Sequence, residues 1–518
     1  MDIGMRIRFA TGSTTVPADR HEPADSVARQ GTAWRWPSPT ELVIALTVLG
    51  GILRFATLNV SSLELDESAT LILVHRGFSG MLSHLSGSES APPLYYTLVW
   101  AWTKVFGAGP LAFRSFSALV GTLTIPVMYA AGKQISPRIG VWAAALATVS
   151  PAMYFYSQEA RAYALMVLFS AAAFAAWQRA LQEPERRQLA LWAGLSILAV
   201  LTHYFAAFLF IPEAVILARR LGWRGVWAPT GAVLLIGLAL VPLAASQRAA
   251  GKSNWIEDLS LRGRVTESVK LFTVGVFGPL VLFATVLAVL LIVGAVVLVL
   301  RRGTKRERRG AWDAAIVAIV AIALPLLLAA THLVDVYDGR NVLAFWVPFA
   351  VVVAAGLGAE RAGRSGALLG GALCAICLAM IAAANLIPAY RRDNWRGVAH
   401  ALGKPATARI IVGAQFAELP LSIYMGPLTT VSGQVPATRE VDFVALRHLR
   451  TVGSPEAPVV PRSAPAGFHL ASVTKTETFA ISRFVAAGAT TLSVTSLDRA
   501  SGQAKACSFC AAEVLLQQ

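Results

Sequence analysis

The recurrence of apolar runs long enough to cross a lipid bilayer constrains this chain more than any other feature. A transmembrane helix needs about 17 to 25 mostly apolar residues, and such runs recur from residue 41 to residue 387 and then stop. Only 14% of the 518 residues are charged, against roughly 25% in soluble domains. We therefore predict an all-α polytopic membrane protein over residues 41–387.

Eleven runs are predicted to be transmembrane helices. Their approximate ranges are 41–59, 110–131, 139–156, 160–181, 189–202, 204–219, 226–245, 271–300, 311–331, 342–358 and 367–387. One further segment, 93–107, is shorter and contains Lys104. It either crosses the membrane or lies along its surface, and the charges of the loops decide between the two.

The distribution of lysine and arginine predicts the topology. If 93–107 lies on the surface, the loops on one side of the membrane hold 15 Lys and Arg in 39 residues, including RRGTKRERRG at 301–310. The loops on the other side hold nine in 93 residues. Cytoplasmic loops carry the excess of positive charge. We therefore predict a cytoplasmic N-terminus, an extracytoplasmic C-terminal domain, and an interfacial helix at 93–107 with Tyr95 and its aromatic neighbours in the headgroup layer.

The two ends of the chain lack apolar runs. Residues 1–40 are rich in Arg, Pro, Ser and Thr and are predicted to be a disordered cytoplasmic tail. Residues 388–518 have mixed polarity, with a helix expected at DNWRGVAHALG, a buried strand at ARIIVGA and alternating strands in GFHLASVTKTETFAISRFV. This pattern predicts a small extracytoplasmic α/β domain with a mobile tail after about residue 488.

Net charge and cysteine content bound the remaining functions. The net charge of +16 would suggest a nucleic-acid partner in a soluble protein, but the basic residues cluster in short loops between apolar runs. They are a topology signal, and no nucleic-acid partner is expected. Cys374 and Cys377 lie inside an apolar run. Cys507 and Cys510 have a spacing compatible with a disulfide, a metal site or a redox pair, and a single pair decides among none of these.

With this topology, the unusual polar residues gather in the outer loops. The first outer loop, 60–109, is the longest between spans and carries LELDESAT, and later outer turns carry YSQEARAYAL, LTHYFA and DVYDGRNVL. Four loops far apart in sequence are therefore expected to meet at one membrane surface. Each residue is also compatible with an ordinary solvated or interfacial role. The polar residues in question are Asp66, Glu67, Glu159, Arg161, His203, Tyr204, Asp335, Asp338 and Arg340.

Acids and arginines at a lipid–water boundary suit a substrate with an apolar tail and an anionic head. A carboxylate can remove the proton of an acceptor hydroxyl group. The planar fork of arginine donates two hydrogen bonds at once to a departing phosphate. The outer loops therefore favour chemistry on a lipid-linked phosphate substrate.

Five patterns in the chain, taken in order, resemble those of one known group of enzymes. They are LDES, APPLYYTLVWAWTKVFG, SPAMYFYSQEARAYAL, THYFA and GRNVLAFWVPFA. Over about residues 41–400 they resemble the GT-C membrane glycosyltransferases, in the branch with the bacterial aminoarabinose transferases and the protein O-mannosyltransferases. Each pattern alone is weak, and it is their order and spacing that make the resemblance specific.

The resemblance implies a GT-C fold and a glycosyltransferase. The enzyme would transfer a sugar from a polyprenyl-phosphate donor to an acceptor at the outer face of the plasma (inner) membrane. It implies that Asp66 is the general base, that Glu67 assists it, and that Glu159 is the second acidic motif. Arg161 would help to hold either the carrier phosphate or Glu159 itself, and Arg340 would bind the carrier phosphate. Tyr95, His203 and Tyr204 are predicted to contact the substrate.

The chain departs from the family at one motif. Relatives commonly have His or Lys before the Pro-Pro-Leu-Tyr-Tyr motif, where this chain has Ala91. Arg114 or His84 would have to supply that positive charge if it is needed. No cofactor is certain, and a divalent cation (Mg or Mn) held by Asp66 and Glu159 remains open.

The main alternative function is a transporter or flippase of lipid-linked sugars. Transporters commonly bind their substrate at the bilayer midplane with ionisable residues inside spans. Here only Arg54 and Glu213 lie well within spans, while the other acids lie at the outer ends. This favours the enzyme. The sequence leaves the donor sugar open, and the acceptor is a cell-envelope glycan, a lipid or a protein.

Overall fold

The computed structural model describes residues 37–447, 458–501 and 512–518. The chain divides into two units, Met1–Ser38 and Pro39–Gln518, and the described helices and strands all lie in the second. The predicted tail at 1–40 falls almost wholly outside the described residues, and so do Cys507 and Cys510.

Helices fill the predicted membrane region, and each predicted span coincides in large part with one helix or with two consecutive helices. The helices are α1 (Pro39–Ala56), α2 (Leu65–His75), α3 (Gly77–Ser88), α4 (Leu94–Phe106), α5 (Pro110–Lys133), α6 (Pro137–Val149), α7 (Pro151–Ser157), α8 (Tyr163–Gln182), α9 (Arg186–Thr202), η1 (Tyr204–Ala206), α10 (Ala207–Leu221), α11 (Trp223–Ala239), α12 (Val241–Ala249), η2 (Asn254–Ile256), α13 (Leu261–Thr273), α14 (Val281–Arg302), α15 (Lys305–Ala330), η3 (Leu343–Phe345), α16 (Trp346–Leu357), α17 (Gly363–Leu386) and η4 (Pro388–Tyr390).

Among the described residues, seven helical segments are long and apolar enough to cross a membrane. They are α1, α5, α8, the stretch Trp223–Ala249 that joins α11 and α12, α14, α15 and α17. The bent pair α6 and α7 would be an eighth, and Leu343–Leu357, which joins η3 and α16, is a shorter apolar helix. The protein is therefore a multi-pass, all-α membrane protein as predicted, while the count of eleven spans stays a prediction.

A proline divides the predicted span 139–156 and places the turn that follows it. Because Pro151 has no N–H group, it cannot continue α6. The Ser150 side chain accepts a hydrogen bond from Met153 N (3.4 Å) and begins α7 instead. The two helix axes differ by 57°. This bend sets the position of the turn at 158–162, which carries Glu159 and Arg161.

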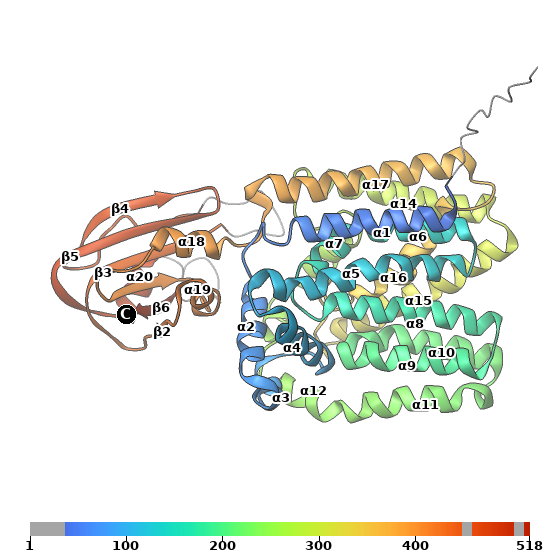
Figure 1. Cartoon of the computed structure of the whole chain (residues 1–518), viewed down its shortest axis with the longest axis horizontal. Helices are drawn as coiled ribbons and strands as arrows, with labels where there is room; N and C mark the ends of the chain where they lie inside the picture. The colour runs from blue at the N-terminus through green and yellow to red at the C-terminus, as the bar shows by residue number, and fades with distance from the viewer. Residues whose placement is uncertain (1–36, 448–457, 502–511) are drawn as a thin grey trace, which may run out of the picture. The chain divides into compact units, whose positions relative to one another are not determined.

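The predicted first outer loop is largely helical. Figure 1 shows α2, α3 and α4 gathered at one end of the long helices. A capping box begins α2, since Glu67 Oε2 accepts from Glu64 N (3.0 Å) while the Glu64 side chain accepts from the first turn. The segment 93–107 is the separate helix α4, but the placement of its Tyr95 in the headgroup layer was wrong. Tyr95 and Tyr96 are buried in the protein interior because α4 packs its aromatic side against its neighbours.

The C-terminal region is a small α/β domain, as predicted. It contains α18 (Trp395–Leu402), β1 (Arg409–Gly413), α19 (Glu418–Met425), β2 (Thr429–Thr430), β3 (Gln434–Leu446), β4 (His469–Lys475), β5 (Phe479–Ser493), α20 (Val494–Ser501) and β6 (Glu513–Gln517). The sheet has the order β2-β6-β1-β3-β5-β4, in which β1 and β3 are parallel and the other pairs antiparallel. The fully buried β1 is the strand expected at ARIIVGA, and the α18 helix is the one expected at DNWRGVAHALG.

The stretch after residue 488, predicted to be mobile, contributes regular structure to this domain. It supplies the end of β5, the helix α20 and the strand β6, which pairs with both β1 and β2. Leu497 of α20 and Val514 of β6 are buried in the domain core.

Candidate active site

The structure brings together residues from four distant segments of the chain. These are the start of α2, the turn between α7 and α8, the loop before η3, and the linker that follows α17. Four arginines and five acids from these segments and their surroundings form ion pairs with one another. Of the four polar loops predicted to meet, the three that carry Asp66, Glu159 and Arg340 therefore lie close together, while the membrane face on which they lie stays a prediction.

Asp66 and Arg340 form the partly exposed ion pair of this cluster. Arg340 Nη1 donates to Asp66 Oδ2 at 3.0 Å, and the two side chains are 25% and 39% exposed, respectively. Arg340 also lies 3.7 Å from Asp338 Oδ1 and over the ring of Trp255, with 4.7 Å from its Cζ to the ring centroid. Burial would raise the pKa of Asp66, but Arg161 and Arg340 outweigh it and hold that pKa below its ordinary value. Asp66 is therefore an ionised carboxylate at neutral pH.

Arg161 pairs with Glu89 and has no ion pair with Glu159, the partner considered from the sequence. Its Nη1 donates to Glu89 Oε2 (2.7 Å) and to Thr70 Oγ1 (2.8 Å), and it lies 3.3 Å from the carbonyl oxygen of Asp66. Both Arg161 and Glu89 are buried. Arg161 thus fixes the backbone of Asp66 and contributes positive charge beside it.

Glu67 is fully buried, and both of its oxygens are occupied. Arg114 Nε donates to Oε1 at 2.7 Å, and Arg114 Nη2 donates to Oε2. The backbone N–H of Ala160 also donates to Oε1, at 2.9 Å. These bonds join α2, α5 and the turn that carries Glu159. Arg114 donates in addition to the carbonyl oxygens of Leu58, Ser61 and Ser62.

Glu159 is buried and faces Arg392, which follows α17. Arg392 Nη2 lies 3.7 Å from Glu159 Oε2, and Arg392 Nε lies 3.3 Å from Glu64 Oε1. The guanidinium also stacks on the ring of Phe155, with its Cζ 3.8 Å from the centroid. Burial raises the pKa of Glu159 to about 8, although Arg392 opposes the shift.

The other three residues predicted to contact the substrate have different surroundings. His203 is buried beside Tyr163, and its ring centroid lies 5.7 Å from the Tyr163 ring. Burial, with Arg161 and Arg340 nearby, lowers the pKa of His203 to about 3, so it is neutral. Tyr204 donates from its hydroxyl to Gln247 Oε1 (2.8 Å), a contact apart from the ion pairs. Tyr95 packs against aromatic side chains in the interior.

Two members of the cluster, Glu89 and Arg392, were not predicted from the sequence. Glu89 accepts from Thr70 (2.8 Å) and from the Tyr96 hydroxyl (2.9 Å) in addition to Arg161. Its signal was a lone acid three residues before Pro92. The signal for Arg392 was an Arg-Arg pair directly after the last span, on the predicted outer face where basic residues are scarce.

Neither proposed substitute for the missing basic residue before Pro92 has a free charge at the cluster. Arg114 is committed to Glu67 and to backbone carbonyls. His84 lies on the exposed side of α3, where its Nδ1 is 2.9 Å from the carbonyl oxygen of Gly80. Asp335, another acid noted in the sequence, pairs with Arg264 (2.6 Å). It therefore has a structural role outside the cluster.

The cluster does not fit a divalent cation. Within residues 37–447, 458–501 and 512–518, no group of three or more His, Cys, Asp or Glu side chains could hold a metal ion. Asp66 pairs with Arg340, and Glu159 faces Arg392. A cation held by these two acids would have to displace the two guanidinium groups that already lie beside them.

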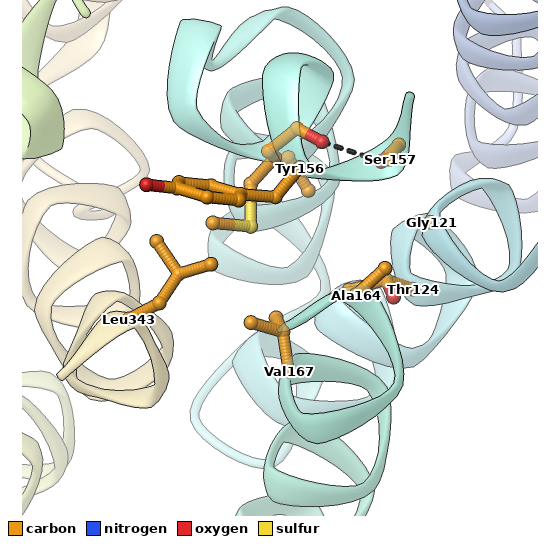
Figure 2. Close-up of a pocket in the computed structure, with 9 residues that line it drawn as sticks. Gly121, Thr124, Tyr156, Ser157, Ala164, Val167 and Leu343 are labelled. Atoms are coloured by element: carbon orange, nitrogen blue, oxygen red, sulfur yellow. Dashed lines mark hydrogen bonds between the residues drawn. The ribbon is translucent and has the colours of Figure 1, made fainter. Parts of the chain in front are cut away.

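A small cavity of about 10 Å³ lies inside the helix bundle beneath the turn that carries Glu159. Figure 2 shows Tyr156, Val167 and Leu343 pointing into it from different helices. Its lining is mostly apolar, and its volume is that of about one water molecule. It is a packing defect next to the site, too small for a sugar.

Glu159→Gln is expected to flatten the pH dependence of stability. The folded state keeps Glu159 protonated up to about pH 8, whereas the unfolded chain releases that proton near the ordinary pKa of 4.5. Stability should therefore fall as pH rises from about 5 to 8, and the glutamine variant should lose this part of the fall. Melting temperatures at several pH values test this, with Glu183→Gln at an exposed acid as the control. Parallel curves for wild type and Glu159→Gln would contradict it.

A sequence-family model and solved structures resemble this chain. Residues 90–246 match the family described as dolichyl-phosphate-mannose-protein mannosyltransferase. This range includes Glu159 and Arg161 but neither Asp66 nor Arg340. No curated protein sequence matches the chain.

Two of the similar structures are of ArnT from Cupriavidus metallidurans. The apo state superposes with a TM-score of 0.51 and 12% identity, covering 75% of this chain and 85% of that one. The structure bound to undecaprenyl phosphate superposes with a TM-score of 0.54 and 10% identity, covering 86% of this chain and 98% of that one. The shared fold therefore extends over both the membrane region and much of the C-terminal domain.

Proposed function

We propose that this chain, a member of the GT-C superfamily of membrane glycosyltransferases, transfers a sugar from a polyprenyl-phosphate donor to an acceptor hydroxyl group. The observation that carries the proposal is the Asp66–Arg340 pair. It joins a carboxylate and a guanidinium at 3.0 Å, both partly exposed, in a cluster whose Glu67, Glu89 and Glu159 are buried. The undecaprenyl phosphate bound to ArnT, which has the same fold, supports a carrier of this class.

Asp66 and Arg340 together can assist both the departure of the phosphate and the attack of the acceptor hydroxyl group. The carrier phosphate would replace Asp66 on Arg340, which then stabilises the negative charge that develops on the departing phosphate. Asp66, released from its partner, would accept the proton of the acceptor hydroxyl. The acceptor oxygen then bonds to the anomeric carbon, while the bond from that carbon to the phosphate oxygen breaks and polyprenyl phosphate leaves. Attack opposite the leaving group inverts the anomeric carbon.

The buried members of the cluster are proposed to support this pair. Arg161 holds the backbone of Asp66, and Glu67 ties α2 to α5 and to the turn at 158–162. Glu159 and Arg392 stabilise the same turn from the linker side. In this proposal Asp66 is the catalytic base, and Glu67 and Glu159 are positioning residues. No step requires a metal ion.

The transporter alternative gains no observation in its favour. Arg54, one of the two ionisable residues deep in a predicted span, donates to Ser157 Oγ (3.0 Å) and to the carbonyl oxygen of Ala147 (2.9 Å). Glu213, the other, accepts from Trp192 Nε1 at 2.7 Å. These bonds join neighbouring helices to one another.

The direct test is sugar transfer by the purified full-length chain. Polyprenyl-phosphate donors carrying mannose, arabinose, galactose or aminoarabinose are incubated with the protein, and release of polyprenyl phosphate is measured. Release from at least one donor is expected. If no donor is bound or consumed by protein that melts cooperatively, the proposed function is wrong.

Arg340→Lys is expected to raise the KM for the donor by roughly ten- to hundredfold, because a hydrogen bond to a charged group is worth about 1.5–3 kcal/mol. Lysine keeps the charge but cannot bind phosphate through a planar fork. Arg262→Lys, at an exposed arginine of α13, is the matched control and should leave KM unchanged. Equal KM values for wild type and Arg340→Lys would remove Arg340 from donor binding.

The same proposal places the cluster on the outer face of the plasma membrane. A reporter inserted into the basic loop at 301–310 should therefore lie in the cytoplasm, and one fused after Gln518 should lie outside. Accessibility of both reporters to a membrane-impermeant label measures this. Labelling of the 301–310 reporter in intact cells would reverse the proposed topology.

A further inference from the structure

A second cavity, of about 300 Å³, lies between the first outer loop and the C-terminal domain. Residues 60–62 form one wall, the linker from Pro388 to Asn394 forms another, and the turn at 476–478 between β4 and β5 closes the third. Its volume is at the lower end of the range for small-ligand pockets, roughly 300–1,000 Å³. Its volume corresponds to about one or two sugar rings.

Hydrogen bonds between the walls hold this cavity open in a defined shape. Ser62 Oγ donates to the carbonyl oxygen of Asp393 and accepts from Trp395 N at 2.9 Å. Asn394 Nδ2 donates to Thr478 Oγ1 at 3.1 Å, which ties the linker to the β4–β5 turn. Nearby, Arg396 Nη1 donates to Asn59 Oδ1 at 2.6 Å. The walls are therefore linked by side chains from three segments.

The lining has the composition of a carbohydrate site. Hydroxyl groups come from both the loop wall and the turn wall, and an amide comes from Asn394. Glu477 and Arg391 add one carboxylate and one guanidinium, which can each bind a pair of neighbouring sugar hydroxyls. Arg392 also lines the cavity, but the carboxyl groups of Glu64, Glu67 and Glu159 lie 3.3 to 3.7 Å from it, so Glu477 and Arg391 leave the lining close to neutral overall and suited to a neutral polyol.

Arg392 connects this cavity to the candidate active site. It lines the cavity and at the same time lies 3.3 to 3.7 Å from the carboxylates of Glu64, Glu67 and Glu159. Its side chain is 7% exposed, and its Nη1 lies 3.6 Å from Glu67 Oε2. Arg392 therefore links one wall of the cavity to the acids of the cluster.

We propose that this cavity binds the acceptor of the sugar transfer, and that the acceptor is a glycan. The inference rests on the proposed function. A sugar unit bound between the β4–β5 turn and the linker would lie beside the cluster that contains Asp66. The C-terminal domain thereby contributes to acceptor recognition through Thr476, Glu477 and Thr478.

Ser61→Trp tests the proposal by filling the cavity. The Ser61 side chain lines it, while its structural contact, the bond from Arg114, is made by the backbone carbonyl and would be retained. Thr474→Trp, at an exposed position of β4 outside the lining, is the matched control. Binding of methyl glycosides of mannose, galactose and arabinose, of inorganic phosphate and of undecaprenyl phosphate is measured by NMR on the full-length chain in nanodiscs.

Wild type and Thr474→Trp are expected to bind at least one methyl glycoside, and Ser61→Trp to bind it at least tenfold more weakly with undecaprenyl phosphate binding unchanged. Glu477→Gln, an exposed change with little risk to folding, should also weaken glycoside binding. Absence of glycoside binding in wild type, equal binding in Ser61→Trp, or competition by phosphate alone would overturn the proposal. If glycoside binding behaves as expected but no donor is consumed, the cavity stands as a glycan site and the proposed function fails.

Discussion

Asp66→Asn is expected to lower the rate of sugar transfer by roughly a hundred- to ten-thousandfold, the usual contribution of a general base. Asparagine preserves the shape of the side chain but cannot accept a proton. The ion pair with Arg340 is partly exposed, so its loss should cost little stability. Binding of undecaprenyl phosphate should persist or strengthen, since Arg340 no longer has Asp66 as a competing partner. The rate of sugar transfer is therefore expected to fall while the affinity for undecaprenyl phosphate is retained or rises.

Steady-state transfer and carrier binding by the same purified variant measure this separation. Asp258→Asn, which removes an exposed acid from the loop before α13, is the matched control and should match wild type in both measurements. A rate unchanged by Asp66→Asn, in protein that still binds the carrier, would exclude Asp66 as the base. A variant that loses carrier binding and thermal stability together would show instead that Asp66 holds the site in place.

The sequence predicted those parts of the fold that have long apolar runs or regular patterns of apolar residues. An apolar run of twenty residues has few alternatives to a membrane helix, so the helical segments were located from composition alone. The strand at ARIIVGA was similarly clear because it is fully buried between polar segments. Topology placed the loops that carry Asp66 and Arg340 on one predicted face of the membrane, but it did not predict the contact between the two side chains.

The pairings inside the cluster were not predictable, because they depend on three-dimensional positions that the sequence does not specify. Arg161 lies two residues from Glu159, but the turn directs its guanidinium to Glu89, 72 positions away. Arg392 lies 237 positions from Phe155, whose carbonyl oxygen accepts its Nη2–H. Glu89 and Arg392 each had only a weak local signal, a lone acid before Pro92 and an Arg-Arg pair after the last span, respectively.

The structure differs from the sequence prediction at two other places, where the same sequence pattern is compatible with two structures. The aromatic residues of α4 have the amphipathic character of an interfacial helix, but Tyr95 and Tyr96 pack into the protein instead. The run 139–156 is apolar throughout, and only Pro151 marks the 57° bend inside it. Proline is a strong breaker of helices in water, whereas neighbouring helices often tolerate it in membranes, so the bend depended on packing.

Removal of the charge opposite Glu67 is expected to have the largest effect on stability. Arg114→Met leaves the Glu67 carboxylate fully buried without its closest counter-charge, and loss of one partner of a buried ion pair typically costs about 3–5 kcal/mol. Arg392, 3.6 Å from Glu67 Oε2, compensates only in part. The melting temperature in detergent should fall markedly. The double variant Arg114→Met/Glu67→Leu should recover part of the loss, because no unpaired charge is then buried.

A substitution at Glu67 itself distinguishes a positioning role from a direct role on the substrate. If Glu67 positions the α2 helix and the turn at 158–162, Glu67→Gln should lower the melting temperature while the folded fraction keeps a transfer rate within roughly tenfold of wild type, far less than a general base contributes. If Glu67 acts on the substrate, the variant should be stable and nearly inactive. Its burial and its four hydrogen bonds to Arg114, Ala160 and Glu64 favour the first result, since neither oxygen can reach an acceptor without breaking one of them.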